Sequence, residues 1–436
     1  DLLNHLFSHV VLGANIQTIR FPSFDKFPFM EEWKEYRLGD IITIKGGYPY
    51  KGSLIGKGNN YLLSMGCVSF TEQFLDKGAR NYEGDCDSRY YVFPGDIVLA
   101  TRQQSDNLPI LGLPAIIPQK YESSKLIVGA NLYKVENHNK DFPNSYLYWL
   151  LKSPQYIRHI RSCQTGTTVR MITKSNIEDY HFLAPSKSRR NEIARFLWNI
   201  ENKIELNRKI NSNLEEQAKA LFKSWFIDFE PFKDGKFVDS ELGKIPEGWK
   251  VVTIGEVTDN IKEKVGDRDS IKVLSPVTSG HLVLSEEYFS KQVFSSSIAK
   301  YIVVKHNDFA YNPARINIGS IGMNEFEFDG CVSPVYVVFR CQSGYEYFFD
   351  LYRRTSYFIE EVKKRAIGGV RQTLSYKDLS LIQLIYPPKK VVDAFNSIFI
   401  GFIHEIHSND VSNRKLEAIR DALLPKLMSG EIEVRS

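Results

Sequence analysis

The sequence predicts an α+β protein in which two tandem mixed α/β domains are separated by two long helices that pair as an antiparallel coiled coil. Three observations support this prediction. A helical pattern without Pro or Gly runs through residues 188–226. The order of motifs that precedes this pattern starts again after it. A second long helical pattern, at residues 389–428, closes the repeat.

The first long helical pattern has apolar side chains at alternating spacings of four and three residues from Ile193 onward. This alternation is typical of the narrow seam of a coiled coil, and a helix of this length would extend roughly 55 Å.

Both long patterns are polar in their middles, so we expect them to pair middle to middle, with buried Asn side chains fixing the register. The second seam is expected to begin with Val391, Phe395 and Ile398. The alternative is two amphipathic helices on separate cores. The principal residues expected in the seam are Leu197, Ile200, Ile204, Asn207, Asn211, Leu214, Phe402, Asn409, Leu416 and Ile419.

Short motifs occur twice with a period of about 200 residues, which indicates a duplicated domain-plus-helix rather than a solenoid. The segments between them, about residues 45–90 and 258–300, match weakly, and we expect the copies to differ in specificity there. The matched pairs are WKEYRLGDI (Trp33) with WKVVTIGEV (Trp249), PGDIVLAT (Pro94) with HNDFAYNP (His306), ANLYKV (Ala130) with SPVYVV (Ser333), and TTVRMITKSNI (Thr167) with GGVRQTLSYKDL (Gly368).

These motifs and patterns divide the chain into six segments. Within the first domain, we expect the helix over Ser145–Arg161 to be divided at Pro154, because proline interrupts helical hydrogen bonding. The first segment should lie outside the fold, with a genuine N-terminal arm as the alternative. The segments are an N-terminal extension (1–32), a first domain (33–187), a central long helix (188–227), a connector (228–248), a second domain (249–388) and a C-terminal long helix (389–430).

Composition places the chain among ordinary globular proteins. It has 436 residues, 43% of them hydrophobic, and a formal net charge of +4. The five Cys residues are odd in number and show no CxxC spacing, so we expect reduced thiols in a cytoplasmic protein. Apolar runs do not reach the roughly 20 residues that a membrane-spanning helix needs.

Motifs for catalysis or metal binding are weak. The stretch GSLIGKG at Gly52 lacks the spacing and the Ser/Thr of a phosphate loop, and is predicted to be a turn. Asp350 and Glu361 loosely fit a nuclease spacing, but they fall in helical patterns where a nuclease site would need strands. His404 and His407 are three residues apart rather than four, which favours a solvated helix face. We therefore predict neither a catalytic site nor a metal site.

Basic residues gather before each long helix, together with Gly and Thr. Between Asp141 and Glu178 there is no acidic residue. Basic side chains and free backbone amides suit phosphate groups, while Arg, Gln and Asn can read base edges in the major groove. The alternative for each residue is a solvated surface position. The candidate DNA-contacting residues are Arg102, Gln103, Gln104, Arg158, Arg161, Arg170, Lys174, Asn312, Arg315, Asn317, Arg371 and Gln372.

The connector WFIDFEPFKDGKFVDSELGKIPEGWK (Trp225–Lys250) resembles that of the specificity subunits of Type I restriction–modification systems. The paired openings and the TVR…SNI and GVRQTLS…DL stretches resemble the same family, so the resemblance covers about residues 33–430. His306 and Asn307 depart from the pattern, because they replace the Pro–Gly turn of the first copy.

The resemblance implies a sequence-specific DNA-binding subunit without catalysis of its own. Two target-recognition domains would each read one half of a split DNA sequence, and two antiparallel helices would separate them. The implied partners are double-stranded DNA, two methyltransferase subunits and the translocating endonuclease subunits. Those partner subunits are expected to use S-adenosylmethionine, ATP and Mg²⁺, and this chain is expected to bind no cofactor and no membrane.

Two other functions stay open on the residues alone. One is a stand-alone DNA-modifying enzyme with an unrecognised active site, against which the missing cofactor motifs weigh. The other is a helical interaction scaffold without DNA binding. DNA affinity that falls with salt, on a slope set by the number of phosphates contacted, would exclude the scaffold.

Overall fold

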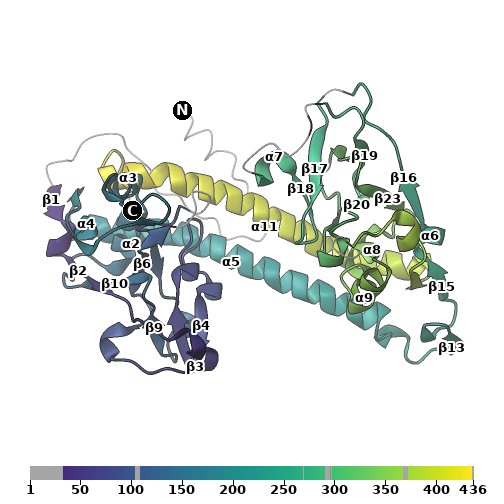
Figure 1. The fold of residues 1–436 in the computed structure, drawn as a ribbon, viewed down its shortest axis with the longest axis horizontal. Helices are drawn as coiled ribbons and strands as arrows, with labels where there is room; N and C mark the ends of the chain where they lie inside the picture. The colour runs from purple at the N-terminus through teal and green to yellow at the C-terminus, as the bar shows by residue number, and fades with distance from the viewer. Residues whose placement is uncertain are drawn as a thin grey trace. The chain divides into compact units, whose positions relative to one another are not determined.

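The computed structural model describes residues 33–103, 109–268, 270–289, 295, 297–366 and 372–434 (Figure 1). The expected N-terminal extension, residues 1–32, lies outside this described part. The chain divides into two compact units, one made of residues up to Asn207 together with those from Val411 onward, the other of Arg208–Asp410. Each unit contains two four-stranded sheets, short helices and part of each long helix, and the predicted α+β class is confirmed.

The first unit holds twelve strands among its described residues, and its helix α2 (Asn144–Lys152) is followed at once by α3 (Pro154–Cys163). The expected helix is therefore divided at Pro154, and Ser153 caps α3 by accepting a hydrogen bond from the backbone of Tyr156. The strands are β1 (Lys34–Arg37), β2 (Ile42–Gly46), β3 (Ile55–Leu63), β4 (Ala79–Tyr82), β5 (Tyr91–Val92), β6 (Ile97–Ala100), β7 (Arg102–Gln103), β8 (Pro114–Ile116), β9 (Leu126–Val128), β10 (Leu132–Asn137), β11 (Arg170–Met171) and β12 (His181–Ala184), and the third short helix is α4 (Lys174–Glu178).

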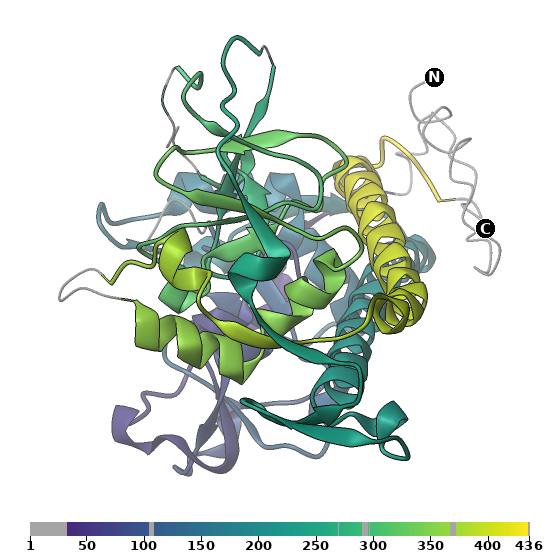
Figure 2. The same cartoon turned by 90° about the vertical axis from the view of Figure 1, so that its right-hand side faces the viewer.

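The second unit faces the viewer in Figure 2, where its strands lie beside the long helices. It begins with the end of the first long helix and a connector hairpin of β13 (Phe237–Ser240) and β14 (Gly243–Pro246). Its other strands are β15 (Lys250–Thr253), β16 (Thr258–Ile261), β17 (Lys272–Pro276), β18 (Leu282–Leu284), β19 (Ile302–Val304), β20 (Phe309–Tyr311), β21 (Ile321–Met323), β22 (Gly330–Val332), β23 (Val337–Cys341) and β24 (Gln383–Tyr386). Its short helices are α6 (Ile254–Val257), α7 (Ser285–Tyr288), α8 (Glu346–Tyr352), α9 (Ser356–Arg365) and α10 (Tyr376–Leu379).

Sheet topology repeats strand by strand between the units. The order β2-β10-β6-β8 in the first corresponds to β16-β23-β20-β21 in the second, and all neighbours are antiparallel. The order β4-β3-β9-β5 corresponds to β18-β17-β22-β19, with one parallel pair at the centre of each sheet. The pair β1-β12 corresponds to β15-β24. The two copies therefore share one topology even where their sequences match weakly.

The two long helices, α5 (Lys187–Phe226) and α11 (Lys389–Ser429), pair antiparallel within each unit. In the first unit, the buried side chains of Glu201 and Arg420 form an ion pair at 2.7 Å. The Nδ2 atom of Asn207 donates to Oδ1 of Asn413 at 2.8 Å. Partner numbers fall along α11 as they rise along α5, which is the antiparallel order.

In the second unit the same order continues. Asn409 Nδ2 donates to Oδ1 of Asn211 at 2.9 Å, and the rings of Phe226 and Phe395 lie 5.0 Å apart. Asparagine side chains therefore hydrogen-bond across the middle of the helix pair in both units. Polar pairs at such positions fix register at a cost in stability.

Burial in the helix pair differs in part from the expected seam. Ile398 is 42% exposed, and Phe399, at 3%, is buried in its place. The reason is that α11 also packs against its own domain here, with the rings of Phe399 and Tyr347 5.3 Å apart. Leu214 and Phe402 are half-buried, whereas the buried positions are Leu197, Ile200, Ile204, Asn207, Asn211, Asn409, Leu416 and Ile419.

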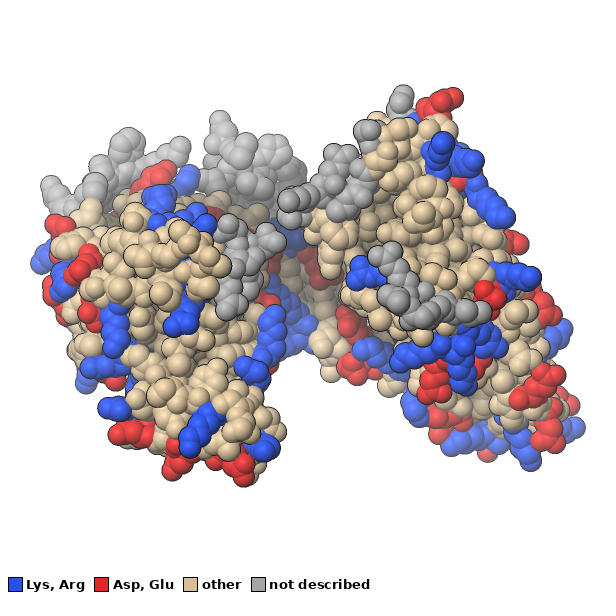
Figure 3. Space-filling view, in the orientation of Figure 1, with Lys and Arg blue, Asp and Glu red and all other residues tan. Residues whose placement is uncertain are grey.

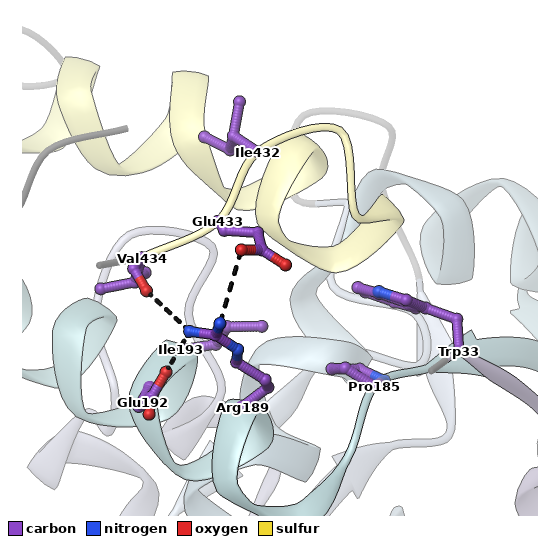
Figure 4. A pocket seen from close by; sticks show the side chains of 8 residues that line it. All are labelled: Trp33, Pro185, Arg189, Glu192, Ile193, Ile432, Glu433 and Val434. Atoms are coloured by element: carbon purple, nitrogen blue, oxygen red, sulfur yellow. Dashed lines mark hydrogen bonds and ion pairs between the residues drawn. The ribbon is translucent and has the colours of Figure 1, made fainter. Parts of the chain in front are cut away.

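The last described residues return to the start of the first domain (Figure 4). Arg189 Nη1 donates to the carbonyl oxygen of Val434 at 3.2 Å, and its Nη2 lies 3.5 Å from the carboxylate of Glu433. Gly430 has φ +74°, and a Cβ there would lie 2.8 Å from the ring of Trp33. A residue with a side chain would not fit at that turn, so the end of α11 packs closely on the opening motif.

Candidate nucleic-acid interface

Two stretches chosen from the sequence meet in the first unit. Strand β7 follows the central strand β6 and pairs antiparallel with β11, so that Arg170 lies opposite Gln103 and Met171 opposite Arg102. Arg102 is exposed, whereas Gln103 is only 7% exposed. Arg102 can therefore reach a ligand from this ladder, while the amide of Gln103 is largely enclosed. The role of Gln103 in DNA contact stays a prediction.

The loop before β11 is closed by backbone hydrogen bonds and a glycine turn. Thr165 and Met171 exchange two backbone hydrogen bonds, at 3.0 and 2.8 Å. Gly166 has φ +92°, and a Cβ there would lie 2.2 Å from the carbonyl oxygen of Val169, so the turn requires glycine. The hydroxyl of Tyr133, on β10, donates to the carbonyl oxygen of Ile172 at 3.1 Å and anchors the loop to the sheet.

Further basic candidates lie on the two short helices next to this loop. Arg158 and Arg161 are exposed on α3, and Lys174 is exposed in the first turn of α4. The two helices are joined by the ring nitrogen Nε2 of His159, which lies 2.7 Å from the carbonyl oxygen of Asn176. Four of the basic candidates in the first unit, on α3, α4 and β7, are therefore accessible to a polyanion.

The second unit brings the corresponding loops together by different contacts. The loop after β20 contains a 3₁₀ turn at Ile316–Ile318. Asn317 Nδ2 donates to Oε1 of Gln372 at 3.2 Å, and the backbone amide of Leu374 donates to the carbonyl oxygen of Pro313 at 3.1 Å. The hydroxyl of Tyr311 donates to the carbonyl oxygen of Leu374 at 3.2 Å. Like the bond from Tyr133 in the first unit, it anchors the loop to the sheet, although Tyr311 lies on β20 and Tyr133 on β10.

Two candidates in this loop have distinct surroundings. The side-chain oxygen of Asn312 accepts a hydrogen bond from the backbone of Ala314 at 3.0 Å, so that oxygen serves the loop itself. Arg315 is exposed at the start of the 3₁₀ turn. Arg315, rather than Asn312, is therefore the side chain that this part of the loop presents outward. Gln104 and Arg371 lie outside the described residues.

An Arg side chain lies near a half-buried Tyr at equivalent positions of both units, and these tyrosines are not among the residues predicted from the sequence. Burial raises the pKa of Tyr133, and the charge of Arg102 opposes that rise. Burial likewise raises the pKa of Tyr336, and the charge of Arg315 opposes it. The two tyrosines occupy the same place in the repeated motifs ANLYKV and SPVYVV, which is the signal that could have identified them.

Basic side chains also gather over α8 and α9 in the second unit (Figure 3). Asp350, which had suggested a nuclease spacing, is buried against Arg353 and lies 2.7 Å from Arg354. Burial alone would raise the pKa of Asp350, but the two guanidinium groups hold it below its ordinary value. Glu361 is 2.9 Å from Lys364 in the same helical region. Both carboxylates are thus used in ion pairs on helices.

The other sequence motifs with catalytic or metal-binding residue types lie on a helix face and in a turn that leads into a strand. His404 and His407 are exposed on α11, as expected for a solvated face. GSLIGKG forms a 3₁₀ turn at Gly52–Leu54 and then enters β3. In the described part of the chain, no three His, Cys, Asp or Glu residues are arranged to hold a metal ion. None of the helices described there has an apolar stretch of membrane-spanning length.

Comparison with known proteins finds a matching family model and similar proteins. Residues 30–216 match the family described as the Type I restriction modification DNA specificity domain. The Type I restriction enzyme MjaIX specificity subunit of Methanocaldococcus jannaschii is 26% identical over 423 residues, covering 93% of this chain and 94% of that one. The HindI specificity subunit of Haemophilus influenzae is 23% identical, covering 92% of this chain and 100% of that one.

The fold also has a relative among solved structures. The crystal structure of a Type-I restriction-modification system S subunit from M. genitalium has a TM-score of 0.56 and 13% identity. The similarity covers 95% of this chain and 98% of that one. Residues 30–216 thus match the specificity-domain family, and the chain along most of its length is similar in sequence to specificity subunits of Type I restriction enzymes and in fold to an S subunit.

Proposed function

We propose that this chain reads a bipartite DNA sequence and directs the methyltransferase and endonuclease subunits of a Type I complex to it. The observation that carries the proposal is the repeated junction of two loops at the same place in two sheets of identical topology. Each junction presents an exposed Arg, namely Arg102 in the first unit and Arg315 in the second. Two copies of one reading surface in a single chain suit two half-sites.

The side chains divide into two roles in this proposal. Arg158, Arg161 and Lys174, on short helices beside the first loop junction, bind phosphates and position the protein on the duplex. Arg102, Arg315 and the Asn317–Gln372 pair lie at the junctions themselves and read base edges. Phosphate contacts supply affinity without sequence information, whereas Arg, Asn and Gln can bond base edges in pairs of hydrogen bonds.

The chemistry belongs to partner subunits in this proposal. The chain binds two methyltransferase subunits and the endonuclease subunits, and those subunits use S-adenosylmethionine, ATP and Mg²⁺. The ion-paired state of Asp350 and Glu361 supports this division, because carboxylates held by Arg and Lys are poorly available for metal binding or proton transfer.

The test compares the full-length chain with and without its methyltransferase subunit. Each preparation is incubated with S-adenosylmethionine and genomic DNA, and methylated positions are mapped by sequencing. Methylation should occur only when both proteins are present, and only at a two-part motif with a fixed gap. Methylation by the purified chain alone would instead establish a stand-alone modifying enzyme.

The helix pair is the proposed ruler between the two half-sites. A heptad added to each helix keeps the seam in phase and lengthens the pair by roughly 10 Å, or about three base pairs. Insertion after Leu214 in α5 and at the level of Ile406 in α11 should widen the gap without changing either half-site. Insertion into α5 alone should disrupt pairing. Changed half-sites with an unchanged gap would contradict the ruler.

A further inference from the structure

An apolar side chain projects from the middle of the second unit's reading loop. Ile318 is 53% exposed and lies at the end of the 3₁₀ turn, next to Asn317 and three residues after Arg315. Ile316, in the same turn, is 4% exposed and anchors the loop in the core. The turn therefore buries one isoleucine and presents the other outward between polar candidates for base reading.

The backbone fixes where Ile318 points. The amide of Ile318 donates to the carbonyl oxygen of Arg315 at 3.2 Å. The amide of Gly319 donates to the carbonyl oxygen of Ile316 at 3.0 Å. Gly319 has φ +91°, a conformation that favours glycine, and a Cβ there would lie 3.0 Å from the carbonyl oxygen of Thr278. The hydrogen bond between Asn317 and Gln372 ties the turn to the second loop. The exposed isoleucine is thus presented by an ordered turn.

The surroundings of Ile318 combine apolar and basic groups. A cavity of about 330 Å³ is lined by Ile318 and by Ile359, which is itself 41% exposed. Lys363 and Arg354 line the same cavity. A single exposed isoleucine needs no explanation, but an apolar contact beside amides and cations matches the chemical composition of a major-groove contact at an A·T pair.

We propose that Ile318 is a specificity-determining residue that contacts the 5-methyl group of a thymine in one half-site. This inference rests on the proposed function and extends it by assigning one base to one side chain. The thymine methyl is the apolar feature that distinguishes an A·T pair in the major groove. The neighbouring Asn317 and Gln372 amides can bond the paired or adjacent adenine, since Asn and Gln suit its N6 and N7 atoms.

The test removes the methyl group from the DNA and the side chain from the protein. Duplexes carry the methylation motif mapped for the complex of the full-length chain with its methyltransferase subunit, and each thymine of either half-site is replaced in turn by uracil. Binding of each duplex by that complex is then measured. Replacement of the one thymine that Ile318 contacts should weaken binding about fourfold, the factor expected for burial of a single methyl group. Ile318→Ala should bind the thymine and uracil duplexes equally well.

A matched control is Leu381→Ala, which truncates a 57% exposed leucine of the same unit outside the reading loops. This variant should keep the full response to uracil. Equal thermal midpoints of the two variants and the wild type would show that both are folded, which their surface positions favour.

Three outcomes would overturn the assignment. A bipartite motif whose binding responds to no uracil replacement would reject the methyl contact while leaving the proposed function intact. An unchanged uracil response in Ile318→Ala would place the contact on another residue. Absence of any sequence-specific binding or methylation would reject the proposed function and the assignment together.

Discussion

The two units share a strand order but differ in how the loops that carry the candidate DNA-contacting residues are built. In the first, β7 and β11 form a short ladder, and Arg102 extends from it. In the second, a 3₁₀ turn carries Arg315 and Ile318, and an amide pair joins it to the neighbouring loop. The sheets are therefore a common support, whereas loop construction is where two copies of one domain can come to recognise different bases.

The helix pair differs between the units as well. The first unit stabilises it with a buried ion pair between Glu201 and Arg420, whereas the second uses the rings of Phe222, Phe226 and Phe395. Truncating one of several packed rings leaves the other apolar contacts in place. Removing one member of a buried ion pair instead leaves a buried charge without a partner.

The largest effect is expected for Arg420→Ala. The substitution strands the carboxylate of Glu201, which is 1% exposed, and should lower the free energy of unfolding by about 3–5 kcal/mol. Urea unfolding followed by tryptophan fluorescence measures this change. Lys219→Ala, which removes an exposed ion pair with Glu216, is the control and should change the midpoint little. The double variant Glu201→Leu with Arg420→Met should recover most of the loss. If Arg420→Ala unfolds at the wild-type midpoint, the ion pair does not support the helix pair.

Asp350→Asn should give the next largest effect, in the second unit. It leaves Arg353, which is 5% exposed, without its buried counter-charge and should destabilise the protein by about 2–3 kcal/mol at pH 7. The folded-state pKa of Asp350 is lowered, so its contribution is full above the unfolded value of about 4 and is lost as pH falls through the lower folded value. The difference between variant and wild type should therefore shrink at acidic pH. A difference that grows on acidification would show that the carboxyl is protonated in the folded state.

A smaller and matched pair of effects concerns phosphate binding. Arg170→Ala in the first unit and Arg371→Ala in the second should each weaken binding to all DNA sequences alike and reduce the salt slope by about 1. Anisotropy titrations at several salt concentrations, on specific and unrelated duplexes, measure both quantities. A change in sequence preference at a constant salt slope would make either residue a base reader.

The smallest effects are expected from the hydroxyl groups that anchor the loops. Tyr133→Phe and Tyr311→Phe each remove one hydrogen bond to the loop before a short helix, worth about 1 kcal/mol, or about fivefold in specific affinity. Each should affect discrimination in its own half-site only, and nonspecific affinity should not change. Tyr121→Phe, whose hydroxyl bonds Asp76 away from these loops, is the control. Loss of discrimination in both half-sites from one substitution would argue against independent loops.

Much of this arrangement was predictable from sequence because duplication leaves matched motifs at matched intervals. The repeat and the two long helices followed from spacing alone, whereas the contact of the loops with DNA stays a prediction. The direction of each side chain could not be predicted, because it depends on the surrounding packing. Gln103 is enclosed, and the side-chain oxygen of Asn312 accepts a hydrogen bond from its own loop. Ile398 faces outward where α11 meets its domain. Ile318 was not among the predicted site residues, because an isoleucine is expected to be buried unless its exposure is known.

The most direct test of two independent readers is a comparison of methylation motifs from the reconstituted complex. Motifs are mapped for the wild type, for Arg102→Ala and for Arg315→Ala. The wild type should give two half-sites with a fixed gap, and each substitution should relax base preference in one half only, a different half for each variant. If both substitutions alter the same half, or if the wild type recognises one uninterrupted sequence, the two units do not read DNA separately.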